Sequence, residues 1–478
     1  MEPAVLDGYD PQGFYCEMLR CAATERLRAR LARLPVAELK RRAAAAEETL
    51  YNLGITFTVY SDSSAIDRIL PFDAIPRVIP GEEWRQIEAG VIQRVTALNL
   101  LLDDIYHEQK ILRDGVVPAE LVLGNINYRP VMRGIPVRHK AYVNICGIDL
   151  ARGEDGAFRV LEDNARTPSG VSYVIENRHM MLRAFPDLLD EFALRPVDTY
   201  GLKLVAAMCE SAPPAARDPQ IVLLSPGTYN SAYFEHVFLA REMGVPLVEG
   251  RDLTVEDDRV YMRTIGGLAA VDVIYRRIND DFLDPEAFRP DSALGVRGLL
   301  RAYKAGNVTL ANAIGTGVAD DKAVYAYMPR VIRYYLGQDP ILPNVETRIC
   351  REPQDLRFTL DHLDKLVVKP VGEAGGYGIT IGPRASRAEL EECRAKLLAD
   401  PANYISQPCL NLSVSPTLVE IEGEGRVEPR HVDLRPFAVT GKDTWVLPGG
   451  LTRVALRRGS LVVNSSQGGG SKDTWVLE

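Results

Sequence analysis

Residues 161–170 of this 478-residue chain read LEDNARTPSG and lie at the end of a predicted β-strand. Because side chains alternate between the two faces of a strand, we expect Glu162 and Asn164 on one face and Asp163 on the other. A carboxylate and an amide oxygen two positions apart can bind one hard cation, and Mg²⁺ completes its octahedron with water and phosphate oxygens. Asp149, on the preceding predicted strand, can supply a second carboxylate. Taken alone, this pattern is more typical of a solvated strand end, so the other motifs decide its meaning.

The residues around this stretch predict a β-hairpin. AYVNICGIDL (141–150) and GAFRVLEDNA (156–165) have the composition of two paired strands on either side of a Gly-Glu-Asp-Gly turn. Arg166 follows the second strand on the side of Glu162, where it could contact a phosphate or a carboxylate.

A second motif, VVKPVGEAGGYGI at residues 367–379, combines a strand-end lysine with a glycine-rich loop. Glycines allow backbone N–H groups to turn toward a bound anion without obstruction from Cβ atoms. The lysine, Lys369, precedes the glycines, so the motif is not the P-loop pattern GxxxxGK[ST]. A flexible hairpin is the alternative interpretation, but the lysine at this position favours phosphate binding. The loop glycines are Gly372, Gly375, Gly376 and Gly378.

The C-terminal strands carry further cationic residues. In RHVDLRPF (430–437), alternation places His431, Asp433 and Arg435 on one face. Arg453 follows in GLTRVAL, and Lys472 ends the glycine-containing segment NSSQGGGSK. In a chain with a net charge of -9, we interpret Arg435, Arg453 and Lys472 as parts of a site for an anionic ligand.

Composition excludes several functional classes. The net charge of -9 argues against a protein that coats nucleic acid. No apolar run approaches the ~20 residues of a membrane span, and acidic residues occupy the N-terminus where a signal peptide would be basic. We therefore expect a cytoplasmic protein without nucleic-acid or membrane partners. Seven scattered cysteines and six scattered histidines, without CxxC or HxxxH, predict reduced thiols and no transition-metal site.

The remaining segments differ in the spacing of their apolar residues and in the secondary structure that it predicts. Residues 17–50 and 83–114 have the spacing of helices. QIVLLSPGTYN (220–230), a helical stretch at 231–244 and VDVIYRRIND (271–280) form the strand–helix–strand order of a parallel α/β unit. A further α+β block follows to the C-terminus.

Within that parallel unit, Arg276, Arg277 and Asp280 come just after a strand, where substrate groups often bind. They could hold an acidic or amino-acid-like substrate. A surface cluster of salt bridges is an equally good interpretation.

The segments GIDL, LEDNARTP, VVKPVGEAGGYGI and YISQP together resemble those of glutathionylspermidine synthetase and related proteins. The closest resemblance is to the circularly permuted ATP-grasp type 2 group of bacterial proteins, and it covers nearly the whole chain. The order of the motifs supports a permutation. Non-permuted ATP-grasp enzymes begin with the lysine and glycine loop and end on the metal-binding pair, which here lies in the N-terminal third instead.

The resemblance implies a mixed α+β and α/β fold, namely a circularly permuted ATP-grasp fold with a Rossmann-like pre-ATP-grasp unit and a helical N-terminal region. It suggests four segments. These are a helical region (1–130), permuted strands with the metal ligands (131–180), the Rossmann-like unit (181–310) and the nucleotide-binding subdomains (311–478).

The resemblance also assigns roles to single residues. The magnesium ligands would be Asp149, Glu162 and Asn164. ATP would be contacted by Lys322, Lys369, Gly372, Gly375, Gly376, Gly378 and the hinge residue Gln407. The arginines that contact phosphate or act in catalysis would be Arg166, Arg435 and Arg453. One departure concerns Gly147, because glutathionylspermidine synthetase has an arginine at this position, two residues before the first metal aspartate. Arg166 or a C-terminal arginine would then replace it.

The implied function is an ATP-dependent carboxylate–amine ligase that uses ATP and two Mg²⁺ ions and acts through an acyl-phosphate. Its partners would be a small-molecule or peptide carboxylate and an amine. The alternatives are a phosphotransferase and a non-catalytic nucleotide-binding protein on the same fold. The sequence identifies neither substrate and gives no indication of the oligomeric state.

Overall fold

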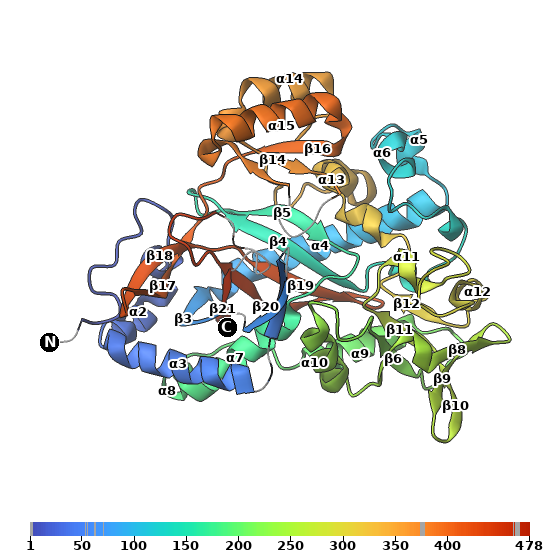
Figure 1. Cartoon of the computed structure of the whole chain (residues 1–478), viewed down its shortest axis with the longest axis horizontal. Coiled ribbons are helices and arrows are strands. Elements are labelled where there is room, and N and C mark those ends of the chain that lie inside the picture. Colours follow the sequence, from blue (N-terminus) through green and yellow to red (C-terminus); the bar gives the residue numbers. More distant parts are fainter. Residues whose placement is uncertain are drawn as a thin grey trace.

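The computed structural model describes residues 3–478, except for positions 53, 55, 62–63, 70, 373–377, 462 and 464–468. For strands β1 (Thr56–Ser61) and β2 (Ser64–Ile69) it describes only the backbone. The structure is a mixed α+β fold with three main sheets (Figure 1). Among the described residues, no helix is both long and apolar enough to span a membrane.

The central sheet joins strands from both ends of the chain. In spatial order its strands are β3 (Phe72–Ile79), β21 (Gly470–Val476), β20 (Thr444–Val454), β19 (Arg435–Thr440), β4 (Ile145–Arg152) and β5 (Phe158–Asn164). β4 and β5 form the antiparallel hairpin that the sequence predicts. β4 also pairs with β19, from Gly147 opposite Phe437 to Ile145 opposite Val439. The N-terminal hairpin thus continues a sheet built from the C-terminus, which is the arrangement expected of a permuted fold.

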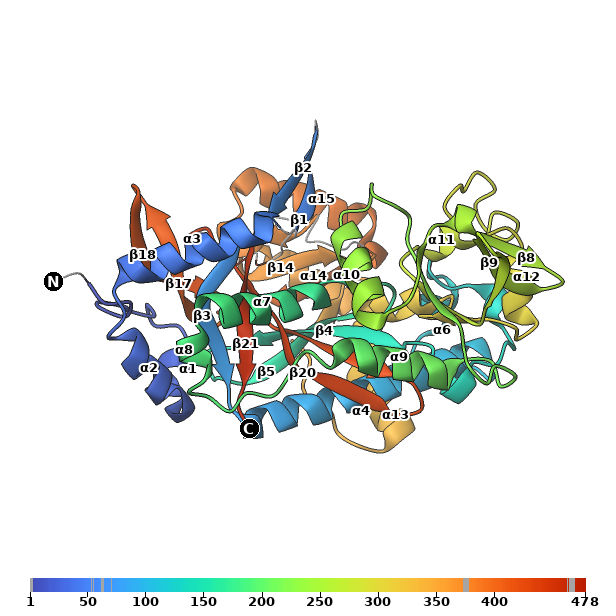
Figure 2. The ribbon, with the colours of Figure 1, turned by 90° about the horizontal axis from the view of Figure 1, so that it is seen from below.

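Helices cover both faces of this sheet because its strands alternate between two apolar cores. On β19, Phe437 and Val439 belong to one core and Ala438 to the other. The first core includes α3 (Val36–Asn52) and α7 (Val171–Ala184), and the second includes α4 (Gly81–Tyr106) and α13 (Lys322–Leu336). Figure 2 shows α7 lying across the sheet from below.

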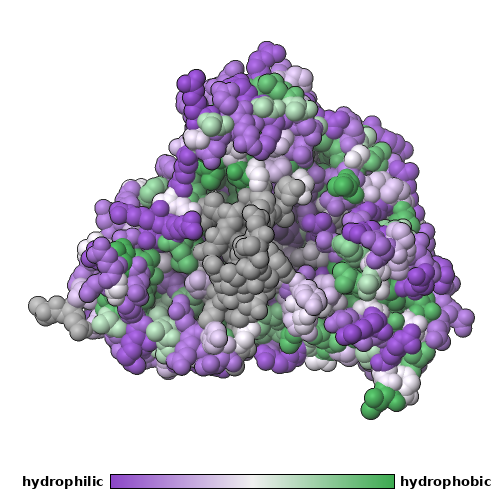
Figure 3. All heavy atoms as spheres, viewed as in Figure 1, coloured by the Kyte–Doolittle hydropathy of each residue, from purple (hydrophilic) through white to green (hydrophobic). Residues whose placement is uncertain are grey.

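A parallel sheet follows in the middle of the chain, as the strand–helix–strand pattern predicts. Its order is β12 (Thr309–Ala311), β11 (Val273–Arg276), β6 (Ile221–Leu224) and β7 (Leu247–Val248). Helices α9 (Tyr200–Ser211) and α10 (Tyr233–Met243) pack against it. The strands β8 (Leu253–Glu256), β9 (Arg259–Thr264) and β10 (Gly267–Val271) form an arm. Its tip, which includes the exposed Ile265, is one of the apolar spots on an otherwise largely hydrophilic face (Figure 3).

The third sheet forms a small subdomain at the top of Figure 1. Its strands are β13 (Arg348–Ile349), β16 (Tyr404–Pro408), β14 (Leu366–Pro370) and β15 (Thr380–Ile381), with helices α14 (Pro353–Asp361) and α15 (Arg387–Ala399) beside them. The cluster of Cys350, Val368 and Leu397 is the centre of its own small core.

The N-terminal region contains strands as well as the predicted helices. β3 pairs in parallel with β21 and is fully buried, so residues 1–130 contribute directly to the central sheet. The remaining elements are α1 (Glu17–Arg20), α2 (Glu25–Leu31), α5 (Lys110–Arg113), α6 (Ala119–Leu123), α8 (Pro186–Leu189), α11 (Asp280–Leu283), α12 (Leu299–Lys304), β17 (Val414–Ile421) and β18 (Glu424–His431).

Candidate functional site

The hairpin of β4 and β5 places three of the predicted magnesium ligands together. Asp149 lies directly opposite Glu162, and Gly147 lies opposite Asn164. Directly opposed residues of antiparallel strands point to the same face, so the three polar side chains are neighbours. Asn164 Nδ2 donates to Asp149 Oδ1 at 3.3 Å. Asp163 points to the other face, as the alternation predicts.

On that other face, Asp163 forms a buried ion pair with Arg94 of α4. The Arg94 guanidinium contacts both Asp163 oxygens, at 2.6 and 2.8 Å, and donates to Asn344 Oδ1 at 2.7 Å. Both charged side chains are almost completely buried. Adjacent residues of LEDN therefore have separate tasks: Asp163 fixes the strand to α4, and Glu162 and Asn164 face the site.

Two arginines from the C-terminal strands converge on Asp149. Arg435 binds both Asp149 oxygens through Nε and Nη2, and Arg453 Nη2 donates to Asp149 Oδ2 at 2.5 Å. Arg453 is held in turn by Asp433, which accepts from its Nε at 3.0 Å. Burial disfavours the charged Asp149, but the two guanidinium groups outweigh it and hold the Asp149 pKa well below its usual range. The polar face of RHVDLRPF is thus an arginine–carboxylate network.

The position of Arg435 accounts for the unusual Gly147. A Cβ atom at Gly147 would lie 3.1 Å from Arg435 Cδ and 3.4 Å from its Cγ. The stem of Arg435 therefore crosses the space that a side chain at position 147 would occupy. Its guanidinium reaches the aspartate two residues further along the strand. The structure thus brings a C-terminal arginine, Arg435, beside the first predicted metal ligand.

The two predicted ATP-contacting lysines approach the same carboxylates. Lys322 begins α13, where the Asp321 side chain caps the helix by accepting from Ala323 and Val324 N–H. Its Nζ lies 3.9 Å from Glu162 Oε2. Lys369, on β14, is buried, and burial lowers its pKa to about 8, although Glu162 opposes this effect. Two lysines that follow Glu162 by more than 150 positions in sequence thus meet around it.

The electrostatics of Glu162 differ from those of Asp149. Burial and the neighbouring charge of Asp149 raise the Glu162 pKa, in spite of Lys322 and Lys369. A buried carboxylate whose negative charge is disfavoured by a second carboxylate is an expected partner of a cation. Glu162 and the Asn164 carbonyl oxygen fit the few protein oxygens that Mg²⁺ takes, with phosphate and water supplying the rest. Both oxygens of Asp149 already accept from arginines, so its direct contact with a metal requires one guanidinium to shift.

The glycine loop is described only at its ends. Gly378 has a left-handed φ of 69°, and a Cβ there would lie 3.2 Å from Pro370, so the return of the loop requires glycine. Gly372 is also within the described part of the chain. Gly375 and Gly376 lie outside the described residues.

Gln407 occupies the last part of β16, opposite Val367. Its side chain is buried and donates to Thr347 Oγ1 at 2.9 Å. The amide therefore links β16 to Thr347, the residue before β13. Contact of the neighbouring backbone with adenine stays a prediction.

Several polar residues that the sequence associates with ligands have structural roles instead. Lys472 is fully buried and binds Asp73 at 2.7 Å, which corrects its assignment to the anion site. Its partner lies 399 residues away, so strand alternation alone could not reveal the pair. Arg276 donates to the carbonyl oxygens of Asn312, Ile278 and Ala313, and Arg277 and Asp280 are likewise buried. This corrects the interpretation of that triad as a substrate site or a surface cluster.

Arg166 is separated from the arginine network. Its Nε lies 3.3 Å from Asp320 Oδ2, and Asp320 Oδ1 accepts from the backbone N–H groups of Ala165 and Arg166. The sequence motifs do not single out Asp320. It precedes Asp321, whose side chain caps α13.

Comparisons with known proteins identify a family and a shared fold. The sequence model of the circularly permuted ATP-grasp type 2 family matches residues 76–455. The uncharacterized protein sll0335 of Synechocystis sp. is 50% identical over 479 residues, which cover 99% of both chains. A Frankia alni protein with the provisional name glutamate–cysteine ligase 2-3 is 42% identical over 483 residues, which cover 99% of this chain and 55% of the relative.

A solved structure shares the fold. The glutathione synthetase-like effector GSS30 of Globodera pallida, in its apo form, is similar with a TM-score of 0.60 over 91% of this chain and 96% of that one. The two sequences are 11% identical, so the likeness concerns the fold alone.

Proposed function

We propose that this chain, which belongs to the circularly permuted ATP-grasp type 2 family, is an ATP- and Mg²⁺-dependent ligase that joins a carboxylate to an amine through an acyl-phosphate. The observation that carries the proposal is the convergence of Glu162 and Asn164 with Lys322, Lys369 and the arginine pair. These groups come from both ends of the sequence and surround one face of the β4–β5 hairpin. The name of the Frankia relative, which is that of a carboxylate–amine ligase, supports the same reaction class.

The charges of the site suit the first step, in which a substrate carboxylate oxygen attacks the γ-phosphorus of ATP and ADP leaves. Lys369 and Lys322 are candidates to bind phosphate oxygens, because the Lys322 ammonium lies 3.9 Å from Glu162 and the buried Lys369 also interacts with that carboxylate. Bound Mg²⁺, held by Glu162 and Asn164 with Asp149 nearby, would neutralise phosphate charge. The lysines would stabilise the charge that spreads over the transferring phosphoryl oxygens.

The arginines suit the second step. The amine nitrogen forms a bond to the acyl carbon, the C–O bond to phosphate breaks, and phosphate leaves with the electron pair and accepts a proton from the nitrogen. A guanidinium close to the acyl group stabilises the tetrahedral oxyanion. Arg435 and Arg453 are candidates because each contacts Asp149, at the edge of the phosphate-binding side chains. Their hydrogen bonds to Asp149 and Asp433 keep both side chains oriented before substrate binds.

The acyl-phosphate can be tested without knowing the amine, because hydroxylamine traps it as a hydroxamate. The protein is incubated with ATP, Mg²⁺, hydroxylamine and single carboxylic acids, beginning with L-glutamate because of the relative's name. We expect ADP, phosphate and hydroxamate in equal amounts with the correct acid. ADP together with a phosphorylated acid that hydroxylamine does not intercept would instead indicate a phosphotransferase. No ADP formation with any acid would favour the non-catalytic alternative.

A further inference from the structure

A pair of opposite charges lies beside the proposed phosphoryl-transfer site and has no role in it. Arg166 follows β5, and Asp320 ends the short 3-10 helix Thr316–Asp320, which Asp321 separates from α13. Their side chains are 27% and 22% exposed. The segments around them are otherwise buried, since Ala165 and residues 316–319 are inaccessible. These two side chains are therefore the points at which both segments present charge to solvent.

The pair is rigidly placed but incompletely satisfied. Asp320 Oδ1 accepts from Ala165 N–H at 2.5 Å and from Arg166 N–H at 3.0 Å, which fixes the carboxylate to the end of the metal-binding strand. Asp320 Oδ2 lies 3.3 Å from Arg166 Nε, but the two groups are not aligned for a hydrogen bond. Among the described residues, this buried Nε has no hydrogen-bond partner. A buried N–H of this kind is normally paired, so the pair has capacity for a ligand.

Four other buried carboxylates of this region do not share this property, whereas Glu162 faces the two lysines of the site. Each of the following is closely bound by an arginine: Asp149 by Arg435 and Arg453, Asp163 by Arg94, Asp433 by Arg453 and Glu235 by Arg277. Burial raises the pKa of Asp320 to about 6 even though Arg166 opposes this effect, which agrees with weak compensation of its charge.

We propose that Arg166 and Asp320 recognise the acceptor substrate, and that this acceptor carries an ammonium group next to a carboxylate, as an α-amino acid does. The ammonium would bind Asp320 Oδ2 and the carboxylate the Arg166 guanidinium, so that each charge of the pair gains a partner. The position agrees with this role. Arg166 is two residues from Asn164, and Asp320 is two residues before Lys322, whose Nζ lies 3.9 Å from Glu162. An amine bound there borders the site where an acyl-phosphate would form, so the inference rests on the proposed function.

The test uses three small probes as competitors of hydroxylamine, which is largely uncharged near neutral pH. Glycine carries both charges, methylammonium only the positive one and acetate only the negative one. In the wild type, glycine should suppress hydroxamate formation at a concentration about tenfold lower than either single-charge probe, as expected for two charged contacts instead of one. Asp320→Asn, which keeps the Oδ1 acceptor, and Arg166→Gln should each lose this advantage. Asp339→Asn, at an exposed surface pair with Arg333, should keep it.

Glycine binding is also measured by calorimetry with ADP and Mg²⁺ present, which separates the two proposals. If the wild type forms no hydroxamate but binds glycine in an Asp320-dependent manner, the ligase reaction is wrong and the recognition site stands. If glycine inhibits and binds equally well in both site variants, or acetate matches glycine, the recognition site is wrong. ADP affinity equal to that of the wild type confirms that each variant is folded.

Discussion

Lys369→Met should weaken nucleotide binding and, at the same time, stabilise the unliganded protein. Burial lowers the Lys369 pKa from 10.5 to about 8, so the charged ammonium is disfavoured in the folded state. That difference corresponds to about 3 kcal/mol. This destabilisation of the folded protein is fully present below about pH 8 and disappears as the pH rises toward 10.5. It is an upper limit for the gain, because Glu162 loses a favourable neighbour when the lysine is removed.

A bound phosphate makes the buried Lys369 ammonium favourable, whereas in the unliganded protein it is destabilising. A charge close to a nucleotide phosphate in a partly closed site contributes roughly 2–4 kcal/mol, or tens to hundreds of fold in affinity. The control is Lys203→Ala, since Lys203 lies on α9 with its Nζ 5.9 Å from the Trp445 ring. Calorimetry with a non-hydrolysable ATP analogue and Mg²⁺ gives the affinities, and thermal unfolding gives the stabilities. Equal affinities in the two variants would refute the assignment of Lys369 to phosphate.

The same residue predicts a pH dependence. Bound phosphate favours the ammonium, so the Lys369 pKa must rise on binding, and binding above about pH 8 takes up a proton. Wild-type affinity should therefore fall as the pH rises through 8, and Lys369→Met should lack this fall. Calorimetry in buffers of different ionisation enthalpy measures the proton uptake directly.

Three further substitutions separate the site from its support. Glu162→Gln should nearly abolish ATP turnover, measured as ADP release, with thermal stability retained; turnover close to wild type would show that the metal assignment is wrong. Asp163→Ala, one residue away, should cost about 3–5 kcal/mol in chemical denaturation because it leaves Arg94 buried without its partner; an unchanged midpoint would contradict this role. Gly147→Ala should lower kcat about tenfold by displacing Arg435, with nucleotide affinity kept within about twofold, and an unchanged kcat would argue against a catalytic role for Arg435.

The parts of the site that sequence predicted are those set by local geometry. Alternation along one strand separated Asp163 from Glu162 and Asn164, and the hairpin turn brought Asp149 opposite Glu162. A period of two and a tight turn involve only neighbouring residues, so the pattern is visible in the sequence. The order of the motifs additionally indicated that the strands of Asp149 and Glu162 lie next to the C-terminal strands.

The parts that sequence did not predict depend on pairings between distant strands. Lys472 and Asp73 are both polar residues on strands and would be expected at a surface or a site, but β3 and β21 are adjacent and bury them together. The surroundings of Asp320 could not be predicted either, because they depend on its hydrogen bond to the residue after β5. Whether a charged strand residue faces a ligand or a buried partner is decided by the neighbouring strand, and a single sequence does not specify that neighbour.

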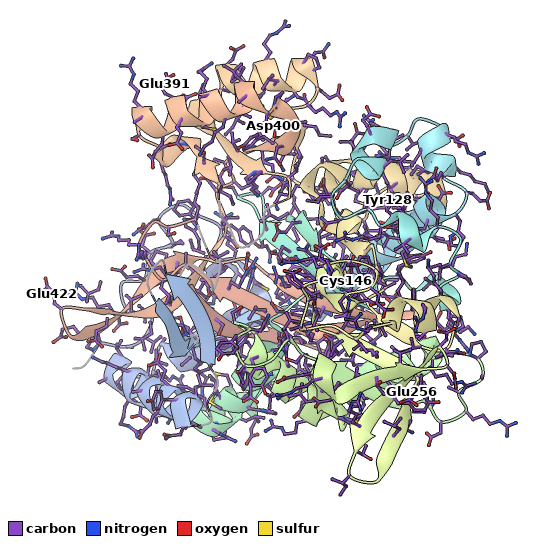
Figure 4. The ribbon with its side chains drawn as sticks, turned by 45° about the vertical axis from the view of Figure 1, so that its right-hand side comes forward. Tyr128, Cys146, Glu256, Glu391, Asp400 and Glu422 are labelled. Carbon is purple, nitrogen blue, oxygen red and sulfur yellow. The ribbon has the colours of Figure 1, made fainter. Side chains whose placement is uncertain are left out.

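The six residues that follow Asn164 explain how a permuted chain can keep one site. This segment, residues 165–170, joins β5, which carries Glu162 and Asn164, to α7. The strand that pairs with β5 is β4, and it contains Cys146, which is labelled near the centre of Figure 4. Arg435 donates to Ser169 O from the C-terminal part of the central sheet. Arg277 and Glu235 bind Pro168 O and Gly170 N–H from the Rossmann-like unit.

The segment is therefore fixed by side chains from two other parts of the chain and not by its own connections. Strand pairing and these contacts require only that the elements are adjacent in space. They do not depend on the order of the elements in the sequence. Moving the β4–β5 hairpin from the C-terminus to the N-terminal third therefore requires different loops but no change in the neighbours that orient Glu162 and Asn164. In this arrangement the Rossmann-like unit is also more than an insertion, because its buried Glu235–Arg277 pair, at 3.0 Å, holds the segment from which Arg166 projects. Loss of that pair should accordingly disturb the acceptor side of the site before the nucleotide side.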